Sequence, residues 1–361
     1  MKAILSGDPM IPSELFEAAY HQHLKPFFPQ VVSQNWEDDW SKLQDRRLKV
    51  EQNGPEIEIV PHVILEHGHD ASFLSGLFFP VSSKVMDAMP NLRMVGLARA
   101  GKENVNLKEA TKRGILVFNV MGRNAEAVSD FAVGLMLAES RNIARAHYSI
   151  KNGGWQKEFS NNDFVPQLKG KKVGIAGFGY IGRLVAKKLS GWDLEVLVYD
   201  AFTPEEEIIQ AGCTPVDKDT LFQQADFLSI HLRLVEATKG WVGKDQLAMM
   251  KKTAVIVNTG RSGLIDMDAL YDALASKQIA GAGLDVFDNE PLEANSKWVN
   301  LDNVTLTTHI AGTTTEVLTK SPYLLFEDIE VFLKGGKPKG LLNPEVLDNP
   351  NFQAWLKEVR K

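Results

Sequence analysis

Cysteine is almost absent from this sequence. The single cysteine, Cys213, cannot form an intramolecular disulfide, which excludes the disulfide frameworks that stabilise small secreted proteins. Long apolar runs are also missing, since no segment reaches the about 18 residues of a membrane-spanning helix. Asp8 and Pro9 interrupt the N-terminal segment before an apolar stretch of useful length develops. We therefore expect a cytoplasmic protein without a membrane span.

An excess of positive charge is lacking as well. The 361 residues include 40 Lys and Arg against 46 Asp and Glu, a net charge of −6. This balance gives no general attraction to nucleic acids or anionic membranes, and we expect neither as a partner. The hydrophobic fraction of 44% is typical of globular proteins, and the length suggests two domains.

The most informative stretch is the glycine-rich segment 171–182, KKVGIAGFGYIG. It predicts a buried strand that ends at Gly177, a turn through Gly179 and a helix that begins near Gly182, followed by a strand that ends on Asp200. This order is typical of a dinucleotide site, in which the first glycine makes the turn, the second admits the pyrophosphate and the third packs helix on strand. Asp200 lies 18 residues past Gly182, near the about 20 expected for the acid that binds the adenosine ribose.

The residues after Asp200 indicate which dinucleotide is bound. They are Ala201 to Pro204 and then three glutamates, with no basic side chain to meet a 2′-phosphate. NAD is therefore expected rather than NADP. An ordinary strand–helix turn at the glycines remains the alternative.

Strands and helices alternate along the chain, which predicts an α/β protein with parallel sheets. Strands are expected at 2–5, 57–60, 63–65, 92–97, 115–118, 173–176, 194–200, 227–231, 254–258, 282–286 and 305–308. A long helix is expected from Asn124 to about Ile150. We expect a nucleotide domain of 121–312 inserted into a domain made of 1–120 and 313–361. Its two crossings, at Gly122 and Gly312, predict a hinge.

Three ionisable residues follow predicted strands in the second half of the chain: Arg261, Glu290 and His309. Ligands of open parallel sheets bind at the carboxyl ends of strands. A carboxylate favours the protonated form of a neighbouring histidine, which can then give a proton to a carbonyl oxygen. The planar fork of arginine binds a carboxylate in two places. Each residue taken singly is also compatible with a surface or capping role.

Taken together, these motifs resemble the D-isomer-specific 2-hydroxyacid dehydrogenases, over about residues 91–343. The resemblance implies a Rossmann NAD-binding domain inserted into a flavodoxin-like substrate domain. It implies NAD-dependent interconversion of a D-2-hydroxy acid and its 2-oxo acid, and a homodimer with the helix near 124–150 in the subunit contact.

The resemblance also assigns roles to individual residues. Arg261 would orient the substrate, His309 would be the acid/base and Glu290 would tune His309. The backbone of loop 99–106 would receive the substrate carboxylate, with Ala100, Gly101, Lys102 and Arg261 as the substrate-binding residues. The implied cofactor-binding residues are Gly177, Gly179, Tyr180, Ile181, Gly182, Asp200, His231, Thr259, Gly260, Arg261, Asp285, His309, Ala311 and Gly312. For His231, a structural role is an equal alternative to a cofactor wall.

Some positions depart from the family pattern. Thr308 stands where most members have proline, and His231 is followed by Leu-Arg-Leu where they often have x-Pro-Leu. Loop 76–80 lacks the arginine common in phosphoglycerate dehydrogenases, which weakens a phosphate-bearing substrate held in that way. Arg99, Lys102 and Arg123 remain candidates to bind a phosphate or a sugar-acid tail.

Other interpretations stay open. A corepressor-like NAD-sensing protein would share the fold and much of the site, and formate dehydrogenase would share the cofactor. His67 and His69 have a spacing that some metal sites use, but solvated loop histidines are the simpler interpretation, and we expect no metal.

Overall fold

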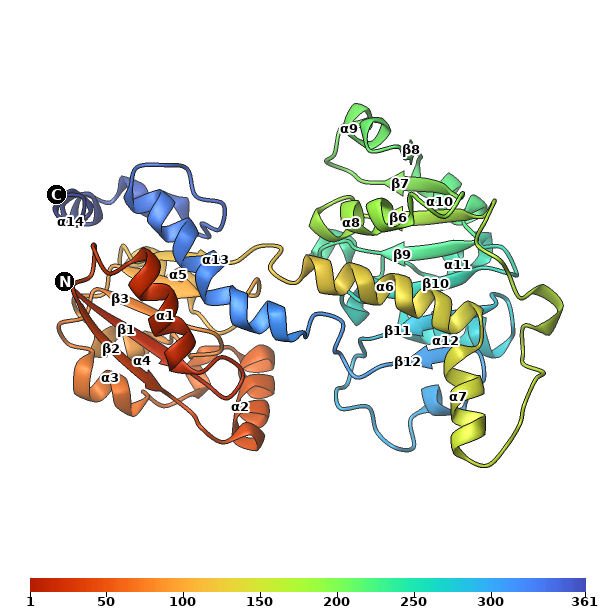
Figure 1. The fold of residues 1–361 in the computed structure, drawn as a ribbon, viewed down its shortest axis with the longest axis horizontal. Helices are drawn as coiled ribbons and strands as arrows, with labels where there is room; N and C mark the ends of the chain where they lie inside the picture. Colours follow the sequence, from red (N-terminus) through yellow and green to blue (C-terminus); the bar gives the residue numbers. More distant parts are fainter. The chain divides into compact units, whose positions relative to one another are not determined.

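The computed structural model describes all residues, 1–361, and the chain divides into two compact units. The first unit contains residues 1–123 and 314–361, and the second contains residues 124–313. The chain therefore leaves the first unit once and returns to it once, so the second unit is an insertion. Each unit is built on its own parallel sheet (Figure 1).

The first unit has a five-stranded parallel sheet in the order β2-β1-β3-β4-β5. Its strands are β1 (Lys2–Gly7), β2 (Gln30–Asn35), β3 (Phe73–Gly76), β4 (Met94–Leu97) and β5 (Leu116–Asn119). This order is that of flavodoxin, in which the crevice between the first and third strands takes the ligand. The predicted flavodoxin-like fold is confirmed.

Helices cover both faces of this sheet. They are α1 (Ser13–His23), α2 (Trp40–Asn53), α3 (His62–His67), α4 (Ser83–Ala88), α5 (Leu107–Lys112), α13 (Thr315–Leu333) and α14 (Pro350–Val359). One core lies under α1, α13 and α14, where Phe16 and Phe326 place their ring centroids 6.1 Å apart. A second core lies under α3, α4 and α5. The C-terminal segment is thus part of the first unit's core.

Part of the predicted secondary structure of this unit is wrong. In place of the strand expected at 57–60, a short 3₁₀ turn (Pro55–Ile57) ends and the chain continues without regular structure; residues 63–65 lie in helix α3. In α3, Val63 and Ile64 are buried while Leu65 is 66% exposed, which is the pattern of a helix with one buried face. Strands β2 and β3 were not expected; β2 is a mostly half-exposed edge strand and β3 spans four residues.

The second unit has a seven-stranded parallel sheet in the order β12-β11-β10-β9-β6-β7-β8. Its strands are β6 (Lys172–Ala176), β7 (Glu195–Tyr199), β8 (Thr214–Pro215), β9 (Phe227–Ile230), β10 (Val255–Asn258), β11 (Gly281–Leu284) and β12 (Val304–Leu306). Numbered within the unit, the first six run 3-2-1-4-5-6, the Rossmann order. The strand order reverses between β6 and β9, which makes this the expected nucleotide crevice. The predicted Rossmann fold is confirmed.

Helices again lie on both faces: α6 (Ala125–Ser140), α7 (Ile143–Lys151), α8 (Tyr180–Leu189), α9 (Glu205–Gln210), α10 (Lys218–Gln224), α11 (Lys244–Met249) and α12 (Met267–Ala275). The core on one face includes residues of α6 and α8, and the core on the other includes residues of α10, α11 and α12. The single helix expected over 124–150 is interrupted, because Asn142 adopts a left-handed conformation with φ of 58° between α6 and α7.

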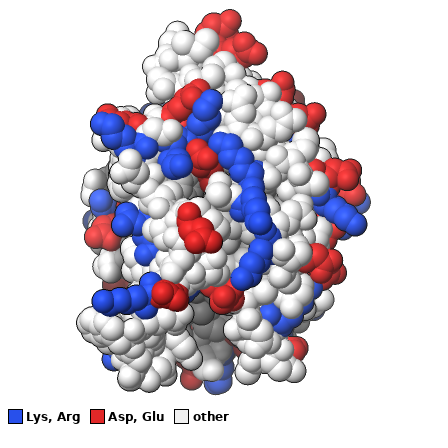
Figure 2. Space-filling model, turned by 90° about the vertical axis from the view of Figure 1, so that its right-hand side faces the viewer, with Lys and Arg blue, Asp and Glu red and all other residues white.

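No helix in the structure has the length and apolar character required to cross a bilayer. Figure 2 shows one face of the molecule, on which a band of Lys and Arg side chains lies among Asp and Glu. Charges of both signs share this surface.

Candidate active site

The glycine turn between β6 and α8 lies at the reversal of the Rossmann sheet. Gly177 has φ of +95°, and a Cβ there would lie 2.8 Å from the backbone of His231, which follows β9. A Cβ on Gly182 would overlap the carbonyl oxygen of Gly177. Both positions therefore require glycine for packing. Gly179 is different, because no atom lies within 4 Å of its would-be Cβ, so the backbone there is open to a ligand.

Asp200 is tied to this turn. Its Oδ2 accepts a hydrogen bond from the Phe178 N–H at 2.6 Å, and its Oδ1 accepts from the N–H groups of Phe202 and Thr203, each at 2.8 Å. Burial alone would raise the pKa of Asp200, but these backbone donors outweigh it and lower the pKa below its ordinary value. The residue is therefore ionised at neutral pH, and it holds the glycine turn in shape. This second role was not predicted from the sequence.

The loop after β9 contributes His231. Its backbone N–H donates to the carbonyl oxygen of Ala176 at 2.7 Å, and its Nε2 lies 2.9 Å from the hydroxyl of Ser229. Burial lowers the pKa of His231 to about 4, so the ring is neutral at physiological pH. A neutral, hydrogen-bonded imidazole suits a wall or structural role better than proton transfer.

The loop after β10 contributes Thr259, Gly260 and Arg261. Asn258 shapes it, since its side chain accepts from the Gly260 N–H at 2.9 Å and donates to the Arg261 carbonyl at 3.0 Å. Arg261 is exposed, and its Nη1 donates only to the carbonyl oxygen of Gly260, at 2.8 Å. The remaining guanidinium donors are therefore available to a ligand. The hydroxyl of Thr259 is buried and has no hydrogen-bond partner in the protein.

These features fit a bound dinucleotide. Gly179 leaves open backbone in front of the N-terminus of α8, where a pyrophosphate is stabilised by free N–H groups. The Thr259 hydroxyl is a buried polar group that needs a partner. Tyr180 and Ile181 form the first turn of α8, and the Tyr180 side chain is 58% exposed.

The loop after β12 contributes His309, whose backbone is held in an unusual conformation. His309 has φ of +57°, a left-handed conformation that costs a non-glycine residue roughly 1–2 kcal/mol. Asp285, fully buried after β11, stabilises the loop: Oδ1 accepts from the Ile310 N–H at 3.0 Å and Oδ2 accepts from the Ala311 N–H at 2.9 Å. The hydroxyl of Thr307 also donates to Asp285, at 2.6 Å.

His309 and Glu290 form a hydrogen-bonded pair. The Nδ1 atom of His309 lies 2.7 Å from Oε2 of Glu290, while Oε1 of Glu290 accepts from the Phe287 N–H at 2.9 Å. Burial would raise the pKa of Glu290, but the hydrogen bonds from His309 and Phe287 and the positive charges of His309 and Arg261 lower it overall. The carboxylate therefore stays ionised. Nε2, the other ring nitrogen of His309, is left for a ligand.

The second unit ends beside its own beginning. A Cβ on Gly312 would overlap the side chain of Asn124, the residue that precedes α6. Glycine is therefore required for the close approach of the two chain ends.

The expected substrate loop, 99–106, lies in the first unit after β4. The side chain of Asn119 donates to the Ala100 carbonyl at 2.7 Å, and that of Asn104 donates to the carbonyl oxygens of Leu77 at 3.4 Å and Phe79 at 2.8 Å. These bonds fix the loop against the ends of β3 and β5. Lys102 is exposed.

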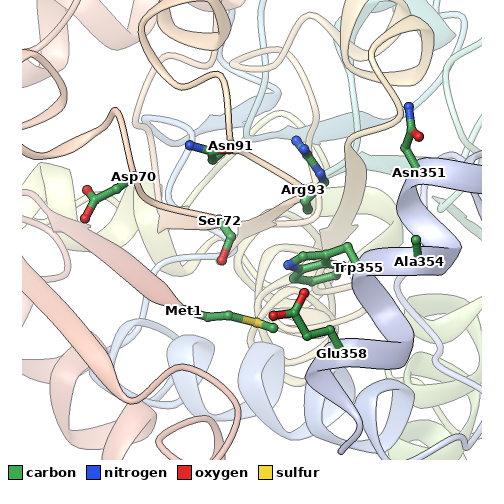
Figure 3. A pocket seen from close by; sticks show the side chains of 9 residues that line it. All are labelled: Met1, Asp70, Ser72, Asn91, Arg93, Asn351, Ala354, Trp355 and Glu358. Atoms are coloured by element: carbon green, nitrogen blue, oxygen red, sulfur yellow. The ribbon is translucent and has the colours of Figure 1, made fainter.

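A cavity of about 440 Å³ lies at the opposite ends of the strands of this sheet, where β1, β3 and β4 begin (Figure 3). Its lining side chains come from the segments that precede these strands and from α14: Met1, Asp70, Ser72, Asn91, Arg93, Asn351, Ala354, Trp355 and Glu358. None of them belongs to the predicted site, which is formed by loops after strands.

Comparison with known proteins agrees with this arrangement. Residues 133–311 match the model of the NAD binding domain of the D-isomer specific 2-hydroxyacid dehydrogenases. The chain is 40% identical over 270 residues to a glyoxylate reductase of Thermofilum pendens, which covers 74% of this chain and 79% of the relative. The chain belongs to the D-isomer specific 2-hydroxyacid dehydrogenase family. The predicted family and its NAD cofactor are thereby confirmed.

Two further proteins show how far the likeness to this dehydrogenase extends. A hydroxypyruvate reductase of Thermotoga maritima is 39% identical over 251 residues, covering 69% of this chain and 80% of the relative. The structure of a D-lactate dehydrogenase from Escherichia coli has a TM-score of 0.68 over 95% of this chain and 100% of that chain. At 23% identity, this second likeness speaks for the fold alone.

Proposed function

We propose that this dehydrogenase interconverts a D-2-hydroxy acid and its 2-oxo acid, with His309 as the acid/base and Arg261 as the residue that orients the substrate. The observation that carries the proposal is the pair of His309 and Glu290 at 2.7 Å, with Arg261 close enough to lower the pKa of the same carboxyl. All three residues follow strands of the Rossmann sheet, at the edge where ligands bind.

NAD, bound as NADH, supplies the hydride for reduction of the 2-oxo acid. Protonated His309 gives the proton from Nε2 to the carbonyl oxygen, because its Nδ1 is engaged by Glu290. Glu290 stabilises the imidazolium and fixes the orientation of the ring. Arg261 binds the substrate carboxylate through its unused donors and polarises the carbonyl.

The loop at Ala100, Gly101 and Lys102 is proposed to receive the substrate carboxylate through backbone N–H groups. Its support is the rigid hold that Asn104 and Asn119 give to the loop. Asp200 is proposed to bind the adenosine ribose, since its Oδ2 has a lone pair beyond the one that accepts from the Phe178 N–H.

The proposal is tested by supplying purified protein with NADH or NADPH and a panel of 2-oxo acids, and following the nicotinamide absorbance. The panel contains glyoxylate, hydroxypyruvate, pyruvate and longer acids. We expect turnover of at least one 2-oxo acid, with NADH preferred. Tight NADH binding without turnover of any member would instead favour an NAD-sensing interaction protein.

A further inference from the structure

The cavity of the first unit lies apart from the residues proposed to carry the reaction. Its volume of about 440 Å³ is within the range of about 300–1,000 Å³ that small-molecule sites have. Its lining residues precede β1, β3 and β4 or belong to α14, so it lies at the amino ends of the strands (Figure 3). The proposed substrate loop, 99–106, follows β4 at its carboxyl end. The cavity is therefore a separate candidate site.

Two polar groups in the wall of the cavity have no partner. The hydroxyl of Ser72, a residue that is 6% exposed, and the indole N–H of Trp355 are buried and form no hydrogen bond in the protein. In Figure 3 the Ser72 hydroxyl and the Trp355 ring nitrogen point toward the same space. Unpartnered buried polar groups are rare in native structures because they forgo their hydrogen bonds with water. Since an indole N–H can only donate, Trp355 requires an acceptor.

The same cavity is lined by charges of both signs. Of its charged side chains, only Asp70 is in an ion pair, with Lys2 at 2.8 Å. The half-buried Arg93 uses Nη1 for two backbone carbonyl oxygens of its own loop, at 2.8 Å and 3.3 Å, which leaves Nε and Nη2 for a ligand. Glu358 is exposed on α14, three residues after Trp355 and on the same face of the helix. A guanidinium and a carboxylate are thus both available.

The cavity also has an apolar wall. The ring of Trp355 packs against Phe352 and Phe28, with ring centroids 5.4 Å and 6.4 Å apart. These contacts hold the indole in one orientation, so its face and its N–H are positioned before a ligand arrives. Met1 and Ala354 add further apolar surface to the lining. A ligand that fits this cavity therefore has an apolar part as well as polar groups.

We propose that this cavity binds a small zwitterion, an α-amino acid with an apolar side chain. Its carboxylate accepts hydrogen bonds from Arg93 and from the indole N–H of Trp355. Its ammonium group donates to the carboxylate of Glu358 and to the hydroxyl of Ser72. Its side chain packs on the Trp355 ring and Met1. A ligand with only one charge would leave either the guanidinium or the carboxylate without a partner.

The test is isothermal titration calorimetry of the full chain with L-phenylalanine, L-leucine and L-methionine. Each amino acid is compared with one analogue that lacks the amino group and one that lacks the carboxylate; for phenylalanine these are 3-phenylpropionate and 2-phenylethylamine. We expect at least one amino acid to bind with a Kd of about 1 mM or lower. Both of its analogues should bind about tenfold more weakly or less, because each loses a charge-assisted hydrogen bond.

Variants of the lining residues assign the binding to this cavity. Arg93→Gln and Glu358→Gln should each weaken amino acid binding about tenfold, and Trp355→Phe, which keeps a ring but removes the N–H, about threefold. Lys357→Gln is the matched control, because Lys357 is an exposed neighbour on α14 that does not line the cavity. If Arg93→Gln fails to fold, the exposed Glu358→Gln still decides the question.

Three results would overturn the inference: no binding of any of the three amino acids at about 10 mM, equal affinity for an amino acid and one of its analogues, or unchanged affinity in both Glu358→Gln and Trp355→Phe. The proposed function would stand in each case, because none of its residues lines the cavity.

Discussion

At the scale of single residues, the hydrogen bond between Glu290 and His309 orients the ring of the proposed acid/base. Because Glu290 has a lowered pKa, it is ionised throughout the neutral range and stabilises the imidazolium. The stability that this depressed pKa contributes is present above the ordinary value of 4.5 and is lost as the pH falls through the lower, folded-state value.

Glu290→Gln should move the pH profile of 2-oxo acid reduction. The variant removes the negative charge that lies 2.7 Å from the ring of His309, so the pH dependence of kcat/KM should differ from that of the parent. The profile is measured at fixed NADH from pH 5 to 9, and Glu293→Gln, an exposed neighbour, serves as control. A profile identical to that of the parent would exclude the proposed pairing.

Contacts between residues far apart in the sequence could be predicted only where both residues belong to recognisable motifs. Arg261, Glu290 and His309 follow recognisable strands, so their proximity could be anticipated. Arg47 and Phe78 belong to segments without any motif, and only the fold brings them into contact. The second role of Asp200, holding the Phe178 N–H, likewise depends on the exact path of the turn.

At the scale of elements, the turn between β6 and α8 contains glycines that are needed for two different reasons, close packing and open backbone. Gly177 and Gly182 are required by protein packing, whereas Gly179 faces open space. The sequence predicted this element well, because glycine spacing is a local signal. It did not predict β2, β3 or α3, since short or edge segments carry weak periodicity and their conformation is set by neighbouring elements.

Substitution of these glycines by alanine should give opposite phenotypes. Gly182→Ala forces a methyl group into the Gly177 carbonyl and should lower the free energy of unfolding by about 1–3 kcal/mol. Gly179→Ala meets no protein atom and has φ of −77°, so its unfolding should change little. It should nevertheless weaken NADH binding roughly tenfold if the pyrophosphate approaches there.

Urea unfolding and NADH fluorescence titration measure these two quantities, and each glycine variant is the control for the other. Unaltered NADH affinity in a folded Gly179→Ala variant would show that the cofactor does not approach this backbone.

At the scale of the whole molecule, one chain leaves part of its apolar surface exposed. Large side chains between residues 143 and 155 are exposed: Ile143 at 56%, Tyr148 at 71%, Ile150 at 56% and Trp155 at 76%. Helix α6, by contrast, packs against α8 and the sheet of its own unit. We therefore propose a homodimer whose contact includes α7 rather than α6 alone.

Tyr148→Glu should dissociate the proposed dimer, because it places a charge in the apolar contact. Sedimentation velocity should show twice the chain mass for the parent protein and the chain mass for the variant. Lys151→Glu, on the same helix and already charged, should retain the parent mass. A parent protein that sediments as a monomer at micromolar concentration would contradict the proposal.

Gly312 and Asn124 lie in contact, so the second unit begins and ends at neighbouring positions. The nucleotide-binding unit enters and leaves through neighbouring points, so its host needs only to offer two adjacent chain ends. The unit can therefore be replaced as one continuous segment of the chain. Residues 124–313 can be exchanged for the corresponding segment of a relative with a different cofactor preference, while the proposed substrate loop, 99–106, stays in the recipient chain.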